Sequence, residues 1–458
     1  ERGRERETVC VCVCVSVCLC ALGISSFSAM GLGASRRGGA LLVACCVSVF
    51  LLLCVTQSRA ARVPLRGGGS RLASAADGDL LHVSVVTRHG DRTPLSEIAA
   101  DPIQWDCSQN TLSLEQSQAV LPPQWRPSRM FRREYLTTGD TLRGNCSAGQ
   151  LTVLGFQQQV ELGQRLRARY QGTLFGGQSP PRYSPSTVYV RTTLVPRTQA
   201  SAQGLLQGLF PEETNNRTAS GADTPVQVIP MHTLDSGAEY MHINPSFCPR
   251  VAELVALMFA ENSPSRNQLL EIMAPYVAQI MKVFDSLDPF AGLTNYDSIK
   301  CRYCHQRPLP PGYTEELNTV LTKAFNLFNT MQYNATYWTL APFYGDLLRG
   351  LDDVVAGDST LKFSLYSGHD TTVGPLLVAL QAFDGIWPHY ASNVEFELWS
   401  DSKAGFLVHV MYNLEDLALP GCGNTSWCTL DQLHRVLEAS MPANLKEECK
   451  IKNPLQPL

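Results

Sequence analysis

The strongest constraint on the fold is the stretch from Leu80 to Pro94, which reads LLHVSVVTRHGDRTP. Residues 80–86 are mostly apolar and β-branched, which is typical of a strand buried on both faces. Two arginines, a histidine and a glycine follow at once, and a proline ends the run. In open α/β sheets, ligands bind at the loops that leave the carboxyl ends of the strands. The stretch therefore predicts a buried strand that delivers polar groups to a ligand site.

These polar groups suit the binding and transfer of an oxyanion. Arg88 and Arg92 are permanently charged and can make forked hydrogen bonds to an oxyanion. His89, between them, can act as a nucleophile toward phosphorus. For one such pair a solvated basic turn is the simpler interpretation, but a second cluster, YSGHD at 366–370, also follows a short apolar run. Two clusters at strand ends favour a shared anion site.

RHGDRTP at 88–94, together with His369 and Asp370, resembles the histidine acid phosphatases. The prostatic and lysosomal type is the most similar, from about Leu81 to Cys449. The resemblance implies an α/β fold with a mixed, mostly parallel sheet flanked by helices, like that of phosphoglycerate mutases, and a smaller helical cap. It also implies a phosphatase that hydrolyses phosphate monoesters through a phosphohistidine.

The resemblance assigns roles to single residues. His89 is the expected nucleophile, and Asp370 is the expected general acid. The expected phosphate-binding residues are Arg88, Arg92, Arg191 and His369. Arg191 ends the predicted strand 187–191 and matches the family segment that supplies a third arginine, whereas we expect Arg197 to be structural. We expect no cofactor and no metal, because the sequence has no Gly-rich phosphate loop, zinc spacing or EF-hand pattern.

The chain organisation follows from patterns along the sequence. Residues 1–29 contain a Val-Cys repeat and are interpreted as translated upstream sequence, because the first methionine is Met30. Residues 30–60 read as a secretory signal peptide, and 61–79 as a flexible leader. If the signal is cleaved, no stable membrane span is expected in the mature chain, although an uncleaved anchor stays open. The predicted location is extracellular, or the lysosomal or vacuolar lumen.

The mature chain divides into a core and an insertion. We predict an α/β core domain from residues 80–245 and 346–449, with 246–345 as an α-helical cap. A helix is expected from Thr152, as N-cap, to Tyr170. Further strands are expected at 226–229 and 362–366, and an antiparallel hairpin at 394–412.

Cysteine use also indicates the secretory pathway. Eight of the sixteen cysteines precede residue 60, and the other eight are an even set that predicts disulfides. The resemblance implies Cys248–Cys449, and we also expect Cys422–Cys428. Cys301 and Cys304 match the CxxCH signature of c-type haem, but a local disulfide between them is the better interpretation. Elimination leaves Cys107–Cys146. Four sequons predict glycosylation at Asn145, Asn216, Asn334 and Asn424.

Charge and the complete set of site residues limit the alternatives. A formal net charge of −4 argues against nucleic acid as a partner. A phosphoryl-transfer mutase is opposed by the signal peptide, the disulfides and the His-Asp pair. A non-catalytic secreted binding glycoprotein of the same fold is opposed by the six intact site residues. The natural substrate is left open among phosphoproteins, lysophospholipids, sugar phosphates and inositol phosphates, and the resemblance makes a homodimer an expectation.

Overall fold

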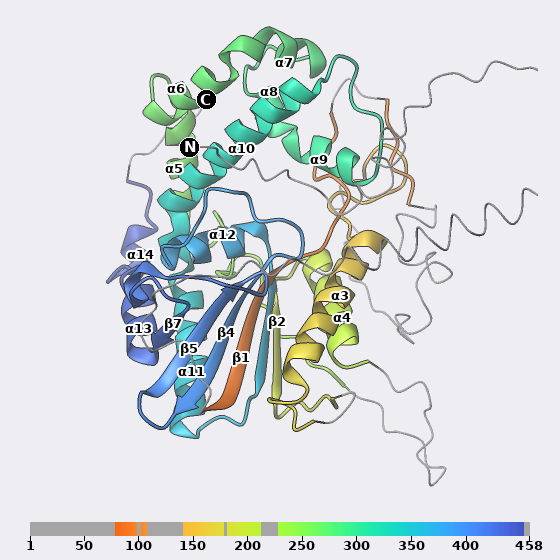
Figure 1. The fold of residues 1–458 in the computed structure, drawn as a ribbon. Helices are drawn as coiled ribbons and strands as arrows, with labels where there is room; N and C mark the ends of the chain where they lie inside the picture. Colours follow the sequence, from red (N-terminus) through yellow and green to blue (C-terminus); the bar gives the residue numbers. More distant parts are fainter. Residues whose placement is uncertain (1–77, 99–101, 108–140, 178–180, 212–227, 453–458) are drawn as a thin grey trace, which may run out of the picture. The chain divides into compact units, whose positions relative to one another are not determined.

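A computed structural model describes residues 78–98, 102–107, 141–177, 181–211 and 228–452 (Figure 1). All of them belong to one compact unit that spans Ser74–Leu458. The predicted upstream segment, signal peptide and almost all of the leader lie outside the described residues, as does the sequon at Asn216. In the described part of the chain, no helix is long and apolar enough to cross a membrane.

The described strands form one seven-stranded mixed sheet. Its strands are β1 (Asp79–Arg88), β2 (Val188–Thr192), β3 (Phe363–Gly368), β4 (Asn393–Asp401), β5 (Gly405–Tyr412), β6 (Glu415–Asp416) and β7 (Trp427–Thr429). The order is β2-β3-β1-β4-β5-β6, with β7 also paired to β5. The pairs β2–β3 and β3–β1 are parallel, and the others are antiparallel. The predicted mixed α/β sheet is confirmed, with its parallel part limited to three strands.

Strand β1 lies inside the sheet, as its composition predicts. Val83 and Val85 pack on one face with α3 (Val153–Tyr170) and α4 (Pro196–Leu209). Val86 packs on the other face in a cluster that includes α11 (Ala341–Ala356) and α13 (Leu430–Glu438). Apolar groups are needed on both sides of such a strand because both faces are removed from water.

Helix α3 begins as predicted, with the Thr152 side chain accepting a hydrogen bond from the backbone N–H of Gly155. It packs closely against α4 through two glycines. A Cβ at Gly163 would lie 2.0 Å from the carbonyl oxygen of Leu205, and one at Gly208 would lie 2.1 Å from that of Val160. The backbones of the two helices therefore pack in direct contact at these positions.

A group of helices lies beyond the carboxyl ends of β1 and β3 (Figure 1). Its members are α5 (Arg250–Phe259), α6 (Pro264–Met273), η4 (Ala274–Tyr276), α7 (Val277–Val283), α8 (Ala291–Thr294), α9 (Tyr296–Cys304), α10 (Glu315–Thr336) and η5 (Tyr337–Leu340). Many of these helices share a separate apolar cluster that includes Leu269, Ile280, Tyr296 and Leu321. Helix α12 (Asp370–Ala379) follows β3, and the short α14 (Leu445–Glu448) precedes Cys449.

Of the strand predicted at 226–229, the two residues that the structure describes, Val228 and Ile229, are not in a strand. Residues 226 and 227 lie outside the described part. Among the described residues, an isolated parallel bridge between Arg191 and His232 is what extends the sheet beyond β2. Pro230 has no backbone N–H to donate, which limits ladder formation in this segment.

Three of the expected disulfides are present: Cys107–Cys146, Cys248–Cys449 and Cys422–Cys428. The expected bond between Cys301 and Cys304 is not formed, and both residues are present as thiols. Both lie on α9, and the thiol of Cys301 is used elsewhere. Its Sγ donates to the carbonyl oxygen of Arg92 at 3.4 Å and lies 3.7 Å from the hydroxyl of Tyr390. That contact directs the sulfur toward the site loop after β1.

Candidate active site

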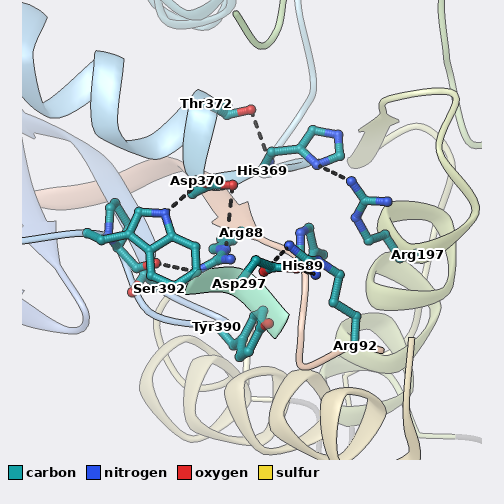
Figure 2. Close-up of polar contacts among 12 residues, drawn as sticks. Arg88, His89, Arg92, Arg197, Asp297, His369, Asp370, Thr372, Tyr390 and Ser392 are labelled. Atoms are coloured by element: carbon teal, nitrogen blue, oxygen red, sulfur yellow. Dashed lines mark hydrogen bonds and ion pairs between the residues drawn. The ribbon is translucent and has the colours of Figure 1, made fainter. Parts of the chain in front are cut away.

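Parallel pairing of β1 with β3 joins the two sequence clusters. Arg88 is the register partner of Gly368, and the backbone N–H of His89 donates to the Gly368 carbonyl at 2.9 Å. His89 and His369, which are 280 positions apart in the chain, consequently have ring centroids 5.5 Å apart (Figure 2). The loop after β1 also lies against α3, where a Cβ at Gly90 would be 2.1 Å from the carbonyl oxygen of Gly155. Gly90 is therefore required by this close approach.

His89 is buried and held in one orientation. Its Nδ1 lies 2.8 Å from the carbonyl oxygen of Gly90, so an Nδ1–H donates there and Nε2 keeps its lone pair. The pKa of His89 lies well below its usual range, chiefly because of burial and then because of the nearby groups Arg197, Arg88, Arg92 and His369. The ring is thus neutral, which is the state a nucleophile needs.

Arg88 is fully buried and enclosed by the loop before β4. Its guanidinium carbon lies 4.2 Å from the ring centroid of Trp387 and 4.4 Å from that of Tyr390. One terminal nitrogen, Nη1, donates to the carbonyl of Pro388 at 2.5 Å. Nε lies 3.9 Å from Oδ1 of Asp370, and neither Nε nor Nη2 has a hydrogen-bond partner. One edge of this guanidinium is therefore available to an anion.

Arg92 is oriented by a helix that comes from a distant part of the sequence. Asp297 on α9 accepts from Nη1 at 2.9 Å and from Nη2 at 2.8 Å, which is the forked geometry of a strong ion pair. Burial opposes the charge of Asp297, but Arg92 outweighs it and holds the pKa of the carboxyl below its ordinary value. The Nε of Arg92 is buried without a partner.

Arg191 and Arg197 are placed differently from the expectation. Arg191 donates to Glu239 at 2.9 Å and to Asp346 at 3.0 Å, so its charge is already neutralised. Arg197 instead lies in the site, with Nη2 3.4 Å from Nδ1 of His369 and Nε buried without a partner (Figure 2). The structure therefore brings Arg197 beside His369, and it pairs Arg191, the expected phosphate ligand, with two carboxylates. Strand β2 ends with a bridge to His232, and Arg197 lies at the start of the following helix, α4.

His369 and Asp370 occupy the start of α12. His369 Nε2 lies 2.9 Å from the hydroxyl of Thr193, and its backbone N–H donates to Thr372. The pKa of His369 lies well below its usual range, because of burial first and the charge of Arg197 second. Since Nδ1 faces a guanidinium donor, the ring accepts there and donates from Nε2.

Asp370 lies between a cation and an aromatic donor. Burial alone would raise its pKa, but Arg88 and a 2.6 Å hydrogen bond from Trp387 Nε1 to Oδ2 hold it below the ordinary value. The hydroxyl of Tyr333 lies 3.5 Å from the same oxygen. The carboxyl is therefore ionised in the ligand-free site.

The comparisons with known proteins agree with this geometry. Residues 79–413 match the model of the histidine phosphatase superfamily, branch 2. The chain belongs to this superfamily. Counting factor 60 of Dictyostelium discoideum is 33% identical over 80% of this chain and 87% of its own length. Prostatic acid phosphatase of Bos taurus is 28% identical over 91% and 97%, and lysophosphatidic acid phosphatase type 6 of Mus musculus is 28% identical over 83% and 90%.

Solved structures support the fold of this histidine phosphatase. The apo form of Hafnia alvei phytase covers 82% of this chain with all of its own length, at a TM-score of 0.52 and 14% identity. A phytase of Klebsiella sp. ASR1 matches with the same coverage at a TM-score of 0.51 and 17% identity. The predicted fold and the predicted family are both confirmed. The predicted function, an acid phosphatase that acts on phosphate monoesters, is confirmed as well.

Several site residues of this histidine phosphatase were missed from the sequence. Asp297 lies in the first turn of α9, and Trp387 and Tyr390 lie in the loop before β4. His242, whose ring centroid is 5.0 Å from that of His369, follows no strand. For Arg197 the sequence offered only a weak signal of a role in the site. It is a second arginine, six residues after Arg191, and a predicted helix follows it. The other residues are recognisable only through their contacts.

Proposed function

We propose that this histidine phosphatase transfers the phosphoryl group to Nε2 of His89 and hydrolyses the phosphohistidine with water. Arg88, Arg92 and Arg197 bind the phosphoryl oxygens, and Arg191 does not. One observation carries the assignment. Around the neutral His89, four buried guanidinium nitrogens have no hydrogen-bond partner: Nε and Nη2 of Arg88, Nε of Arg92 and Nε of Arg197.

Unpartnered buried donors are costly, so such a set indicates an anion that completes it. Phosphoryl transfer proceeds with charge spread over the equatorial oxygens, and preorganised cations stabilise that charge. Burial lowers the pKa of Arg197 to about 9, and it stays cationic at acidic and neutral pH. A non-catalytic binding protein would not need a neutral His89 whose Nε2 keeps its lone pair among these donors.

In the first step, the His89 Nε2 lone pair forms the bond to phosphorus while the bond to the leaving oxygen breaks. Asp370 gives its proton to that oxygen and becomes a carboxylate. Water then attacks phosphorus with Asp370 as the base, releasing phosphate and neutral His89. In the free site the cations hold the pKa of Asp370 low. A bound phosphate ester neutralises those cations, which raises the pKa of the carboxyl and favours the proton it must donate.

A trapping experiment tests this mechanism. After rapid alkaline quench with labelled substrate, we expect phosphate on His89, because a phosphohistidine is stable in alkali and labile in acid. His89→Ala should leave no label. Asp370→Asn should lose about 100- to 10,000-fold in rate on alkyl phosphates and much less on aryl phosphates, whose leaving groups need little protonation. Label on another residue would exclude the mechanism.

We also propose a location in the lumen of the secretory pathway or outside the cell. Three disulfides form in the described chain, and Asn145, Asn334 and Asn424 of the sequons are exposed. A fall in apparent mass after treatment of the secreted protein with an N-glycosidase tests this location. The homodimer and the lack of a nucleic-acid partner stay predictions.

A further inference from the structure

The loop between α12 and β4 places an indole against two of the charged groups that the proposed reaction uses, Asp370 and Arg88. The Trp387 side chain is buried, with a relative exposure of 8%. Its Nε1–H donates to Oδ2 of Asp370 at 2.6 Å, and its ring centroid lies 4.2 Å from the guanidinium carbon of Arg88. One side chain thus contacts the expected acid and one of the expected phosphate ligands.

The hydrogen bond distinguishes the two oxygens of Asp370. Oδ2 accepts from the indole and lies 3.5 Å from the hydroxyl of Tyr333, so its lone pairs are directed at donors. Oδ1 faces Arg88 Nε at 3.9 Å, on the edge of the guanidinium that has no hydrogen-bond partner. A carboxylic acid is most stable with its proton on the oxygen that does not already accept hydrogen bonds.

We propose that Trp387 is a positioning residue that keeps the proton of Asp370 on Oδ1, beside the anion-binding edge of Arg88. The leaving oxygen of a bound phosphate ester takes the proton from Oδ1, and the resulting carboxylate keeps the indole hydrogen bond on Oδ2. This inference rests on the proposed function, since it needs Asp370 as the general acid. It assigns to Trp387 the orientation of the acid relative to the phosphate.

Hydrogen bonds hold the loop that carries Trp387 in place. The backbone N–H of Trp387 donates to Oδ1 of Asn326 on α10 at 3.1 Å. The next residue, Pro388, accepts from Arg88 through its carbonyl, and Ala391 donates to the carbonyl of His89 at 3.1 Å. A side chain held by a braced loop can fix a carboxyl orientation, whereas a mobile one cannot.

Trp387→Phe separates the two contacts of the indole. Phenylalanine has a smaller ring, but it keeps an aromatic face beside Arg88 and removes the N–H donor. We expect kcat/KM on alkyl phosphates to fall on the order of tenfold, because the acid is present but misoriented, while aryl phosphates change little. The inhibition constant for inorganic phosphate should stay the same. Loss of the donor also weakens the ionised form of Asp370, so the alkaline limb of the kcat profile should move to higher pH.

A matched control and a double variant complete the test. Trp338→Phe deletes an indole N–H that donates to the carbonyl of Ala335 and not to Asp370. It should change neither the ratio of aryl to alkyl phosphate rates nor the pH profile of kcat. Adding Trp387→Phe to Asp370→Asn should cause no further change in the aryl-to-alkyl ratio, because both act through one proton. Equal losses on the two substrates in Trp387→Phe, with a normal response of Asp370→Asn, would overturn the role of Trp387 alone. Equal losses in Asp370→Asn would remove the acid itself and overturn both proposals.

Discussion

At the scale of residues, the partners of each arginine decide its role. Arg191 and Arg197 are six positions apart and near the carboxyl edge of the sheet, where Arg191 is buried and Arg197 is half-buried. Arg191 is paired with two carboxylates, Glu239 and Asp346. Arg197 faces His369 and keeps an unpartnered Nε. A guanidinium that keeps an unpartnered buried N–H, as Arg197 does, can bind a further anion through it.

Two substitutions separate these arginines. Arg197→Ala should reduce kcat/KM about 100- to 1,000-fold and weaken inhibition by inorganic phosphate, because one preorganised donor group is lost. Arg191→Ala should leave that inhibition constant unchanged. It should instead lower the free energy of unfolding by about 3–5 kcal/mol, since buried Glu239 loses its partner. Steady-state kinetics and thermal denaturation of both variants compare phosphate binding with stability. Weaker inhibition by phosphate in both variants would contradict the different roles of the two arginines.

At the scale of elements, strand β4 carries two buried glutamates on the face that α3 covers. Glu395 and Glu397 both lie beside the hydroxyl of Tyr170, at 2.8 and 2.9 Å. Glu397 also pairs with Arg169 at 2.7 Å and His409 at 2.9 Å, and its pKa is lowered to about 2 although burial alone would raise it. Burial and then the charge of Glu397 raise the pKa of Glu395 to about 7. Neighbouring carboxyls on one strand thus have opposite preferences for the proton.

The sign of each shift sets a dependence of stability on pH. The folded pKa of Glu395 exceeds its ordinary 4.5, so its contribution is present below pH 4.5 and lost as the pH rises through 7. The loss is on the order of 3 kcal/mol. Glu395→Gln can still accept from Tyr170 and should raise the melting temperature at pH 8 with little effect at pH 4.

Glu397→Gln is the matched control on the same strand. The folded pKa of Glu397 is below its ordinary value, so its contribution is present above pH 4.5 and lost as the pH falls toward 2. This variant should lower the melting temperature at pH 8, because Arg169 and His409 lose a charged partner. Melting curves of both variants at pH 4 and pH 8 are sufficient. Shifts of the same sign at pH 8 would contradict the assignment of charge.

At the scale of the whole molecule, one disulfide connects distant parts of the chain. Cys248, just before α5, is bonded to Cys449, just after α14, across a sequence separation of 201. The backbone N–H of Arg250 also donates to the carbonyl of Cys449 at 3.1 Å. By contrast, Cys422 and Cys428 close a loop with a separation of only 6. The longer loop loses more entropy in the unfolded chain when it is closed.

Replacing both members of each pair by serine should therefore destabilise the protein unequally. In the chain-entropy model, the loss for Cys248 with Cys449 is about 5 kcal/mol, and that for Cys422 with Cys428 is about 2 kcal/mol. Both bonds lie away from His89, so the folded fraction of each variant should keep the parental kcat. Urea unfolding followed by fluorescence compares the variants, and an equal loss would show that chain entropy is not the main term.

The sequence by itself determined the central strand, the helix that Thr152 caps, the two motifs, and with them the family. These features depend on local periodicity, on capping chemistry, and on groups that follow directly after a strand. It also predicted roles for His89 and Asp370, since each is adjacent to an element that the pattern marks.

Only the tertiary structure decided which arginine joins the site, where Cys301 directs its thiol, and which groups hold Arg92 and Asp370. Asp297 reaches Arg92 from 205 positions away, and Trp387 lies in a loop with no pattern. Arg191 and Arg197 are chemically identical in a sequence, and they differ through carboxylates that come from other elements. Partners that are distant in the chain determine charge balance and hydrogen bonding, and these partners exist only after the chain has folded.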